Sequence, residues 1–180
     1  MYVFEIRSTS WATNNTVPRT AKMTHTMNDE LQHTSPAWKS KADFVVGAKI
    51  DDPTWAEHYP YEQLAVAERD NRRYIVCCIP FALYNICLGD YVTVDDEFNI
   101  NKVVERSDYV GFRVATDSID DQDALLHSLH DFEVAVERHS DFLLALAVSN
   151  AVDGKRLAVR LQVAEDEKLI VQYETINTRP

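Results

Sequence analysis

Short apolar or alternating runs separated by polar turns dominate the middle of the chain. Six runs have the length and composition of strands: 44–50, 62–68, 74–79, 91–94, 102–106 and 109–114. The run 74–79 is apolar at every position, which predicts a central strand, and Pro80 is expected to end it because proline cannot donate to a β ladder. Strands at this spacing predict an antiparallel β meander, curled into a small barrel.

The pattern changes after residue 115. A helix is expected to begin at Ser118 or Asp120, either of which can cap it, and its buried stripe is Leu125, Leu126 and Leu129. Further strands are expected at 133–138, 142–148 and 169–174.

Residues 151–167 fit two patterns. Leu157, Val159 and Leu161 alternate as in a strand, whereas Leu157, Leu161 and Ala164 also form a helical stripe. We favour the helix because the order then becomes βαββαβ, the ferredoxin-like unit. The predicted fold class is therefore α+β, with a β meander or small barrel followed by a ferredoxin-like unit.

Three regions follow from these patterns. Residues 1–42 are expected to be an N-terminal extension, partly disordered, because Ser, Thr, Asn, His and Pro dominate it and no apolar period persists. Residues 43–115 are expected to form the β subdomain and residues 111–175 the ferredoxin-like subdomain.

The charge of the chain narrows the choice of partner. The 180 residues are 46% apolar and 26% charged, which is typical of a globular protein, and the net charge is −11. Residues 41–180 carry 14 basic and 26 acidic side chains. Such a surface disfavours nucleic acid and anionic membranes as partners and favours a basic protein.

The cysteines indicate the compartment. Cys77, Cys78 and Cys87 are an odd, closely spaced set without a CxxC pair, so we expect buried, reduced thiols in the cytoplasm and neither a metal nor a cofactor site. The start of the chain lacks the pattern of a secretory signal, and no apolar run approaches the length of a membrane span.

Acidic side chains are the candidate site residues. We expect exposed acids to bind a partner, and the candidates are Asp95, Asp96, Glu97, Asp120, Asp121 and Asp123. Neutralising the first three together is expected to leave thermal stability nearly unchanged, because exposed turn charges contribute little to folding. His127 and His130 share a predicted helix face, but no third ligand converges on them, so we expect them on its solvated side.

Three segments in the middle of the chain form a characteristic pattern: Ile79-Pro80-Phe81, Leu88-Gly89-Asp90 and Val103-Val104-Glu105-Arg106-Ser107. In these segments the chain resembles an uncharacterised bacterial family, domain of unknown function 4265. In physical terms, Gly89 permits a positive φ before Asp90 bonds the turn backbone. The resemblance covers roughly residues 43–175 and implies a βαββαβ-like unit over 111–175, but it implies no catalytic residues.

Three hypotheses of function follow. The first is a non-enzymatic, acidic protein-binding module, most concretely an immunity protein that neutralises a cognate bacterial toxin, such as a nuclease with a basic cleft. The alternative is a small-ligand-sensing regulatory domain of ferredoxin-like type. The third is a hydrolase or transferase built on Cys87 or the histidines, although no nucleophile or phosphate-binding motif is present.

Overall fold

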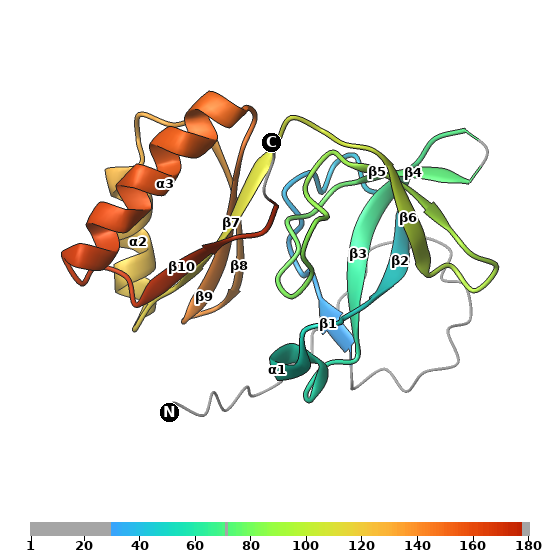
Figure 1. Ribbon diagram of the computed structural model, residues 1–180, viewed down its shortest axis with the longest axis horizontal. Helices are drawn as coiled ribbons and strands as arrows, with labels where there is room; N and C mark the ends of the chain where they lie inside the picture. The colour runs from blue at the N-terminus through green and yellow to red at the C-terminus, as the bar shows by residue number, and fades with distance from the viewer. Residues whose placement is uncertain (1–29, 71, 178–180) are drawn as a thin grey trace.

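The computed structural model describes residues 30–70 and 72–177, which form a mixed α+β fold with two sheets (Figure 1). The expected α+β class is confirmed. Residues 1–29 of the expected extension lie outside the described residues. In chain order the elements are β1 (Glu30–Gln32), β2 (Phe44–Lys49), α1 (Pro53–Ala56), β3 (Tyr61–Glu68), β4 (Arg73–Val76), β5 (Tyr91–Val94), β6 (Ile100–Glu105), β7 (Val110–Ala115), α2 (Ile119–Ser128), β8 (Val134–Ser140), β9 (Leu143–Val148), α3 (Ala151–Asp166) and β10 (Gln172–Thr175).

The first sheet contains β1 to β6. From β2 to β6 each strand pairs antiparallel with the next, and β1 pairs parallel with β3. The sheet curls until the start of β6 meets β2, where the Gly47 N–H donates to the Phe98 carbonyl over 3.0 Å and Gly47 pairs with Asn99. The core of this unit lies inside the curl.

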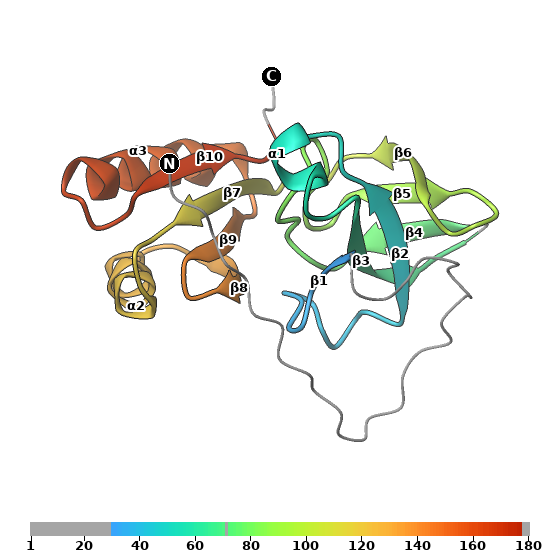
Figure 2. The ribbon, with the colours of Figure 1, turned by 90° about the horizontal axis from the view of Figure 1, so that it is seen from below.

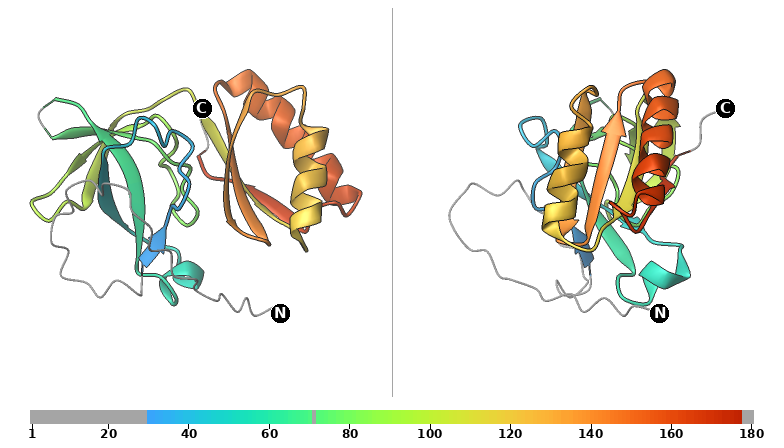
Figure 3. Two further views of the ribbon diagram at one scale, coloured as in Figure 1. Left: turned by 180° about the vertical axis from the view of Figure 1, so that it is seen from behind. Right: turned by 90° about the vertical axis from the view of Figure 1, so that its left-hand side faces the viewer.

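The second sheet has the order β10-β7-β9-β8, with every neighbouring pair antiparallel. Helices α2 and α3 lie side by side over one face of it (Figure 3). The layer between them is filled by buried leucines: Leu125, Leu129, Leu144, Leu146, Leu157 and Leu161. Residues 151–166 are therefore the helix that we favoured over a strand, and Ser118 is the N-cap of α2.

The other face of the second sheet packs against the first unit, so the two units lie side by side (Figure 2). Ala145 and Ala147 of β9, together with Ile176, belong to the same core cluster as Leu64 and Phe81. Alternate residues of β9 face the helices instead. Because both faces of β9 are covered, its sequence is apolar without interruption.

Residues 30–42 differ from the expected extension. Leu31 is buried in the core, and the Trp38 N–H donates to the Cys77 carbonyl over 2.9 Å. Polar residues surround these few buried positions, and their partners are distant in sequence, so no local period reveals them. This corrects the boundary that was expected at residue 42, because the packed body includes residues 30–42.

The strand expected over 74–79 also differs, because β4 ends at Val76. The Cys77 N–H still donates to the Ala65 carbonyl of β3 over 2.8 Å, and the chain leaves the sheet after it. Cys77 and Cys78 are nevertheless fully buried, as expected for at least one of them, and burial raises the pKa of Cys77 to about 11.

The turn Leu88-Gly89-Asp90 fixes the start of β5. Gly89 has a φ of 81°, and a Cβ there would lie 2.9 Å from the Ser107 Cβ. The buried Asp90 carboxylate accepts the Cys87 N–H at 3.0 Å and the Ser107 N–H at 2.7 Å. Asp90 therefore ties this turn to the segment that follows β6, so two of the segments behind the family resemblance are in contact.

In the part of the chain that the structure describes, no helix combines the length and hydrophobicity needed to cross a bilayer.

We predict that Gly154→Ala destabilises the protein, although alanine is the better helix former by about 1 kcal/mol. A Cβ at Gly154 would lie 2.8 Å from the Val110 Cγ2 and 2.9 Å from its Cβ, and a β-branched side chain on a strand has little room to turn. We expect the free energy of unfolding, measured by urea denaturation, to fall by about 1–3 kcal/mol. In a Val110→Ala background the same substitution should cost less, and an equal cost in both backgrounds would contradict the steric explanation.

Candidate functional site

The six acidic candidates lie in two separate places. Asp95, Asp96 and Glu97 form the turn between β5 and β6, whereas Asp120, Asp121 and Asp123 lie on α2. Figure 1 places this turn and α2 at opposite ends of the molecule, so the structure does not bring the two groups together.

Asp95 holds the β5–β6 turn together. Its Oδ1 accepts the N–H of Glu97 at 2.9 Å and that of Asn99 at 2.8 Å. Asp96 pairs with Arg72 at 2.7 Å. Asp95 thus satisfies two backbone donors of the turn, a role that the Oδ1 of an asparagine can keep. That all three acids can be neutralised with little loss of stability stays a prediction.

The acids of α2 belong to a larger acidic surface. Residues 117–141 contain eight acidic side chains and one basic side chain, and seven of the eight acids are at least partly exposed. The β8–β9 turn joins them, because the Gln122 side chain donates to the Ser140 carbonyl over 2.9 Å. We call the following set the α2 acidic face: Asp117, Asp120, Asp121, Asp123 and Asp141.

Part of the α2 acidic face also has local partners. Asp121 accepts the Ser118 hydroxyl at 2.7 Å, and Asp123 pairs with Arg138. Acids in the first turn of a helix also complement its dipole. Asp117, Asp120 and Asp141 are exposed.

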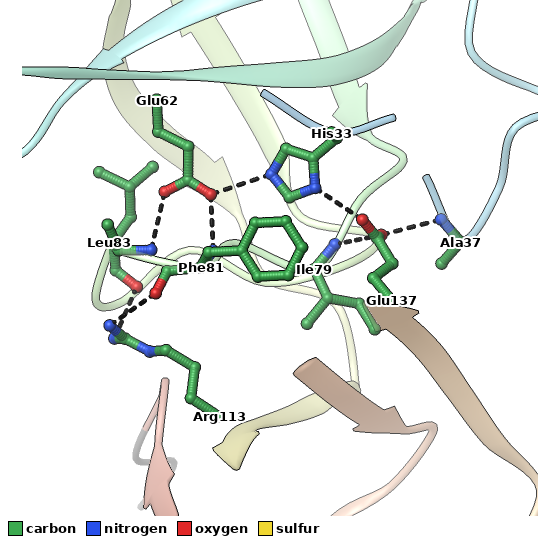
Figure 4. Close-up of polar contacts among 9 residues, drawn as sticks. His33, Ala37, Glu62, Ile79, Phe81, Leu83, Arg113 and Glu137 are labelled. Carbon is green, nitrogen blue, oxygen red and sulfur yellow. Dashed lines mark hydrogen bonds and ion pairs between the residues drawn. The ribbon is translucent and has the colours of Figure 1, made fainter. Parts of the chain in front are cut away.

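A second cluster of charges lies between the two sheets, and the sequence did not reveal it (Figure 4). Glu62 of β3 is fully buried, and its carboxylate accepts the N–H groups of Phe81 at 2.6 Å and Ala82 at 3.0 Å. These two amides belong to the buried segment after β4, which has no strand partner for them. Glu62 therefore supplies the acceptors that a sheet would otherwise provide.

Glu137 of β8 does the same from the second sheet. Its Oε1 accepts the Ile79 N–H at 2.6 Å and the Ala37 N–H at 2.8 Å. His33 lies between the two carboxylates, with Nδ1 2.6 Å from Glu137 and Nε2 2.9 Å from Glu62. The imidazole stacks on the Phe81 ring with 4.5 Å between centroids.

Arg113 of β7 holds the same segment from the other side. Its guanidinium donates to the Phe81 carbonyl over 2.9 Å and the Leu83 carbonyl over 3.2 Å. It also lies 4.2 Å from the Tyr84 ring centroid and 3.3 Å from the half-exposed Glu174 carboxylate. We call His33, Glu62, Arg113 and Glu137 the buried charge network.

The environment of His33 favours its protonated form. Burial lowers the pKa of His33, but its interactions with Cys78, Glu137 and Glu62 outweigh this effect and raise the pKa well above the ordinary value. An imidazolium there donates to both carboxylates at once. With Arg113, the network then contains two cations for two carboxylates.

The buried charge network is shielded from solvent, and its side chains bind one another and the backbone between the sheets. Its side chains are at most 3% exposed, and both ring nitrogens of His33 face carboxylates. Three of its charges sit on strands, and His33 directly follows β1. Glu62 is in phase with the buried Leu64, and Arg113 alternates with the helix-facing Phe112 and Val114. In a sequence, the signal for such a buried charge is a charged residue at a strand position whose alternate neighbours are apolar and buried.

The remaining candidates lie apart from this network. Cys87 is buried. The exposed His127 lies on α2 and the exposed His130 follows the end of that helix, with 6.4 Å between the ring centroids. Among the described residues, no group of three or more His, Cys, Asp or Glu side chains is arranged to hold a metal ion.

Comparison with known proteins adds two findings. A family model described as "Domain of unknown function (DUF4265)" matches residues 62–171. A crystal structure of a hypothetical protein from Neisseria gonorrhoeae is similar, with a TM-score of 0.62 and 14% identity over 74% of this chain and 93% of that one. At this identity the likeness shows a shared fold. No match was found among curated proteins.

We predict that His33 makes stability depend on pH. Because its folded pKa is raised above the unfolded value of about 6.5, its contribution is complete below that pH and is lost as pH rises through the folded pKa. In chemical denaturation, the excess stability of the wild type over His33→Gln should fall above pH 6.5 by up to about 1.4 kcal/mol per pH unit.

His139→Gln is the matched control. Burial lowers the pKa of His139, so its contribution should be present above about pH 6.5 and lost as pH falls. If the stability difference from the wild type changed with pH in the same direction for His33→Gln and His139→Gln, the protonated state assigned to His33 would be contradicted.

We predict that Glu137→Gln costs about 3–5 kcal/mol, because it leaves His33 facing an amide in a buried site. Glu105→Gln removes an exposed pair with Arg73 and should cost about 1 kcal/mol or less. Urea denaturation of both variants at pH 6 measures the difference, and similar losses would show that the network contributes no more than a surface pair.

Proposed function

The chain belongs to the family described as Domain of unknown function (DUF4265), a description that names no activity, and on this premise we propose that it is a protein-binding module. Its most concrete form is an immunity protein that neutralises a cognate toxin, such as a nuclease with a basic cleft. It acts by covering the toxin and not by a chemical step.

The observation that carries the proposal is the α2 acidic face. Of the net charge of −11, residues 117–141 account for −7 within 25 residues. Acids near one helix end can complement its dipole, but five of them repel one another in the absence of a partner. A basic surface placed against them relieves this repulsion and is attracted from a distance.

The buried charge network supports the same proposal. It holds the buried segment 77–83 to both sheets, so the helical layer is carried on a firmly joined body. A preorganised surface loses little entropy on binding. His33, Glu62 and Glu137 are buried and bind one another and the backbone. Contacts with a partner would therefore be made by other, exposed side chains.

We assign the finer fold and location as part of this proposal. The order β7-α2-β8-β9-α3-β10 and the strand order β10-β7-β9-β8 support a ferredoxin-like unit, and the succession β2 to β6 supports a meander curled into a small barrel. The fully buried thiols of Cys77 and Cys78 support a reducing, cytoplasmic setting.

The small-ligand alternative has less support. The helix–sheet interface that such a sensor would use is filled by fully buried leucines. An open depression of about 450 Å³ lies instead in the first unit, beside Lys49, Asp52 and Asn85.

The first experiment identifies the partner by co-purification from the native host and mass spectrometry. We predict that replacing Asp117, Asp120 and Asp141 by asparagine slows association with that partner by about threefold to tenfold, and that added salt removes the difference. Stopped-flow kinetics at low and high salt measure both effects.

A matched control neutralises three exposed acids outside both groups of candidates, namely Asp51, Glu57 and Asp70. It removes the same charge and should slow association less. Equal effects of the two variants would place the interface elsewhere, and a partner without a basic surface, or an association rate indifferent to salt, would contradict the proposal.

A further inference from the structure

Helix α3 has apolar residues on two opposite sides. Leu157 and Leu161 face the second sheet and are buried. Val152, Val159 and Val163 lie on the outer side and are 70%, 67% and 37% exposed. Their spacing of seven and four residues places them in one stripe along the helix.

This outer stripe is costly for the isolated protein. Valine is a poorer helix former than alanine, because its branched side chain loses freedom against the preceding turn. The stripe also exposes apolar surface to water, which a partner can bury. Polar or alanine side chains would serve a purely solvated helix better.

An open groove of about 480 Å³ lies beside the stripe. It is lined by Phe132, Lys155, Arg156, Val159, Arg160 and Val163. Arg156 packs over the Phe132 ring, 5.0 Å from its centroid, and its guanidinium pairs with Asp153. Lys155 and Arg160 are exposed. The groove thus has an apolar floor and a cationic rim, on a chain whose net charge is −11.

We infer that this groove, with the valine stripe, is a docking site for an acidic amphipathic segment of a second protein. Apolar side chains of the segment lie on Val159, Val163 and Phe132, while its carboxylates meet Lys155 and Arg160. Helix-in-groove recognition needs this combination of an apolar floor and a charged rim. The site does not rest on the proposed function, because it selects a partner of opposite charge to the one expected at α2.

Other occupants fit less well. In a twofold dimer through the same face, the three cations of one copy would face those of the other, which is unfavourable. An anionic bilayer covers a wide area of the protein and would be repelled by its net charge of −11. A short acidic segment lies close to the cations of the groove, and its interactions with more distant acids are screened beyond roughly 8 Å at physiological salt.

The test uses the full chain and a synthetic helical peptide with leucine at positions i, i+4 and i+7 and glutamate on its flanks. NMR titration should show saturable shifts confined to α3 and the residues around Phe132. A second peptide with lysine in place of each glutamate should bind at least about tenfold more weakly. Equal binding of the two peptides, or shifts centred elsewhere, would overturn the inference.

Variants of the protein test whether peptide binding depends on the valine stripe and on the cations beside it. Val159→Ser with Val163→Ser should weaken binding of the acidic peptide by about tenfold or more, and Lys155→Gln with Arg160→Gln should remove the preference for it. Val171→Ser is the matched control, because Val171 is 51% exposed outside the groove, and it should change nothing. Light scattering that shows a dimer abolished by Val159→Ser, or binding to phosphatidylserine vesicles that depends on the stripe, would assign the face to another occupant and overturn the inference.

Discussion

A buried backbone without a sheet partner is the constraint on which this structure depends. Residues 78–83 pass between the two sheets almost completely shielded from water, and their N–H groups must find acceptors there. Glu62 and Glu137 provide these acceptors, one from each sheet. Two carboxylates in such a place need compensating charge, which Arg113 and a protonated His33 supply.

This arrangement explains why the body includes residues 30–42. His33 reaches the carboxylates only because β1 pairs with β3 and the following segment runs beside Cys77. The same contacts join the two units, since Glu62 belongs to the first sheet and Glu137 to the second. One cluster therefore satisfies the buried backbone and fixes how the helical layer is presented.

Local pattern was sufficient for most strands and for both long helices, because each buries one face at a regular period. The stripe of Leu157 and Leu161 correctly identified α3, although Val159 and Val163 also fitted a strand. Local pattern was insufficient where long-range partners decide. Beyond β4 the amides of Ile79, Phe81 and Ala82 bind carboxylates from distant strands. Asp95 looked like a free surface acid although it closes a turn.

The two helices of the outer layer differ in charge, and this difference has a consequence for the proposed binding. A uniformly acidic protein attracts a basic partner in many orientations. Here α2 carries the acidic face, whereas the neighbouring α3 presents Lys155, Arg156 and Arg160. On the proposed function, a basic surface would be attracted to α2 more strongly than to α3, where the acids Asp153, Glu165 and Asp166 offset the three cations. An acidic segment docked beside the valine stripe would use residues other than those of the α2 acidic face, so the two proposed partners would not compete for the same residues.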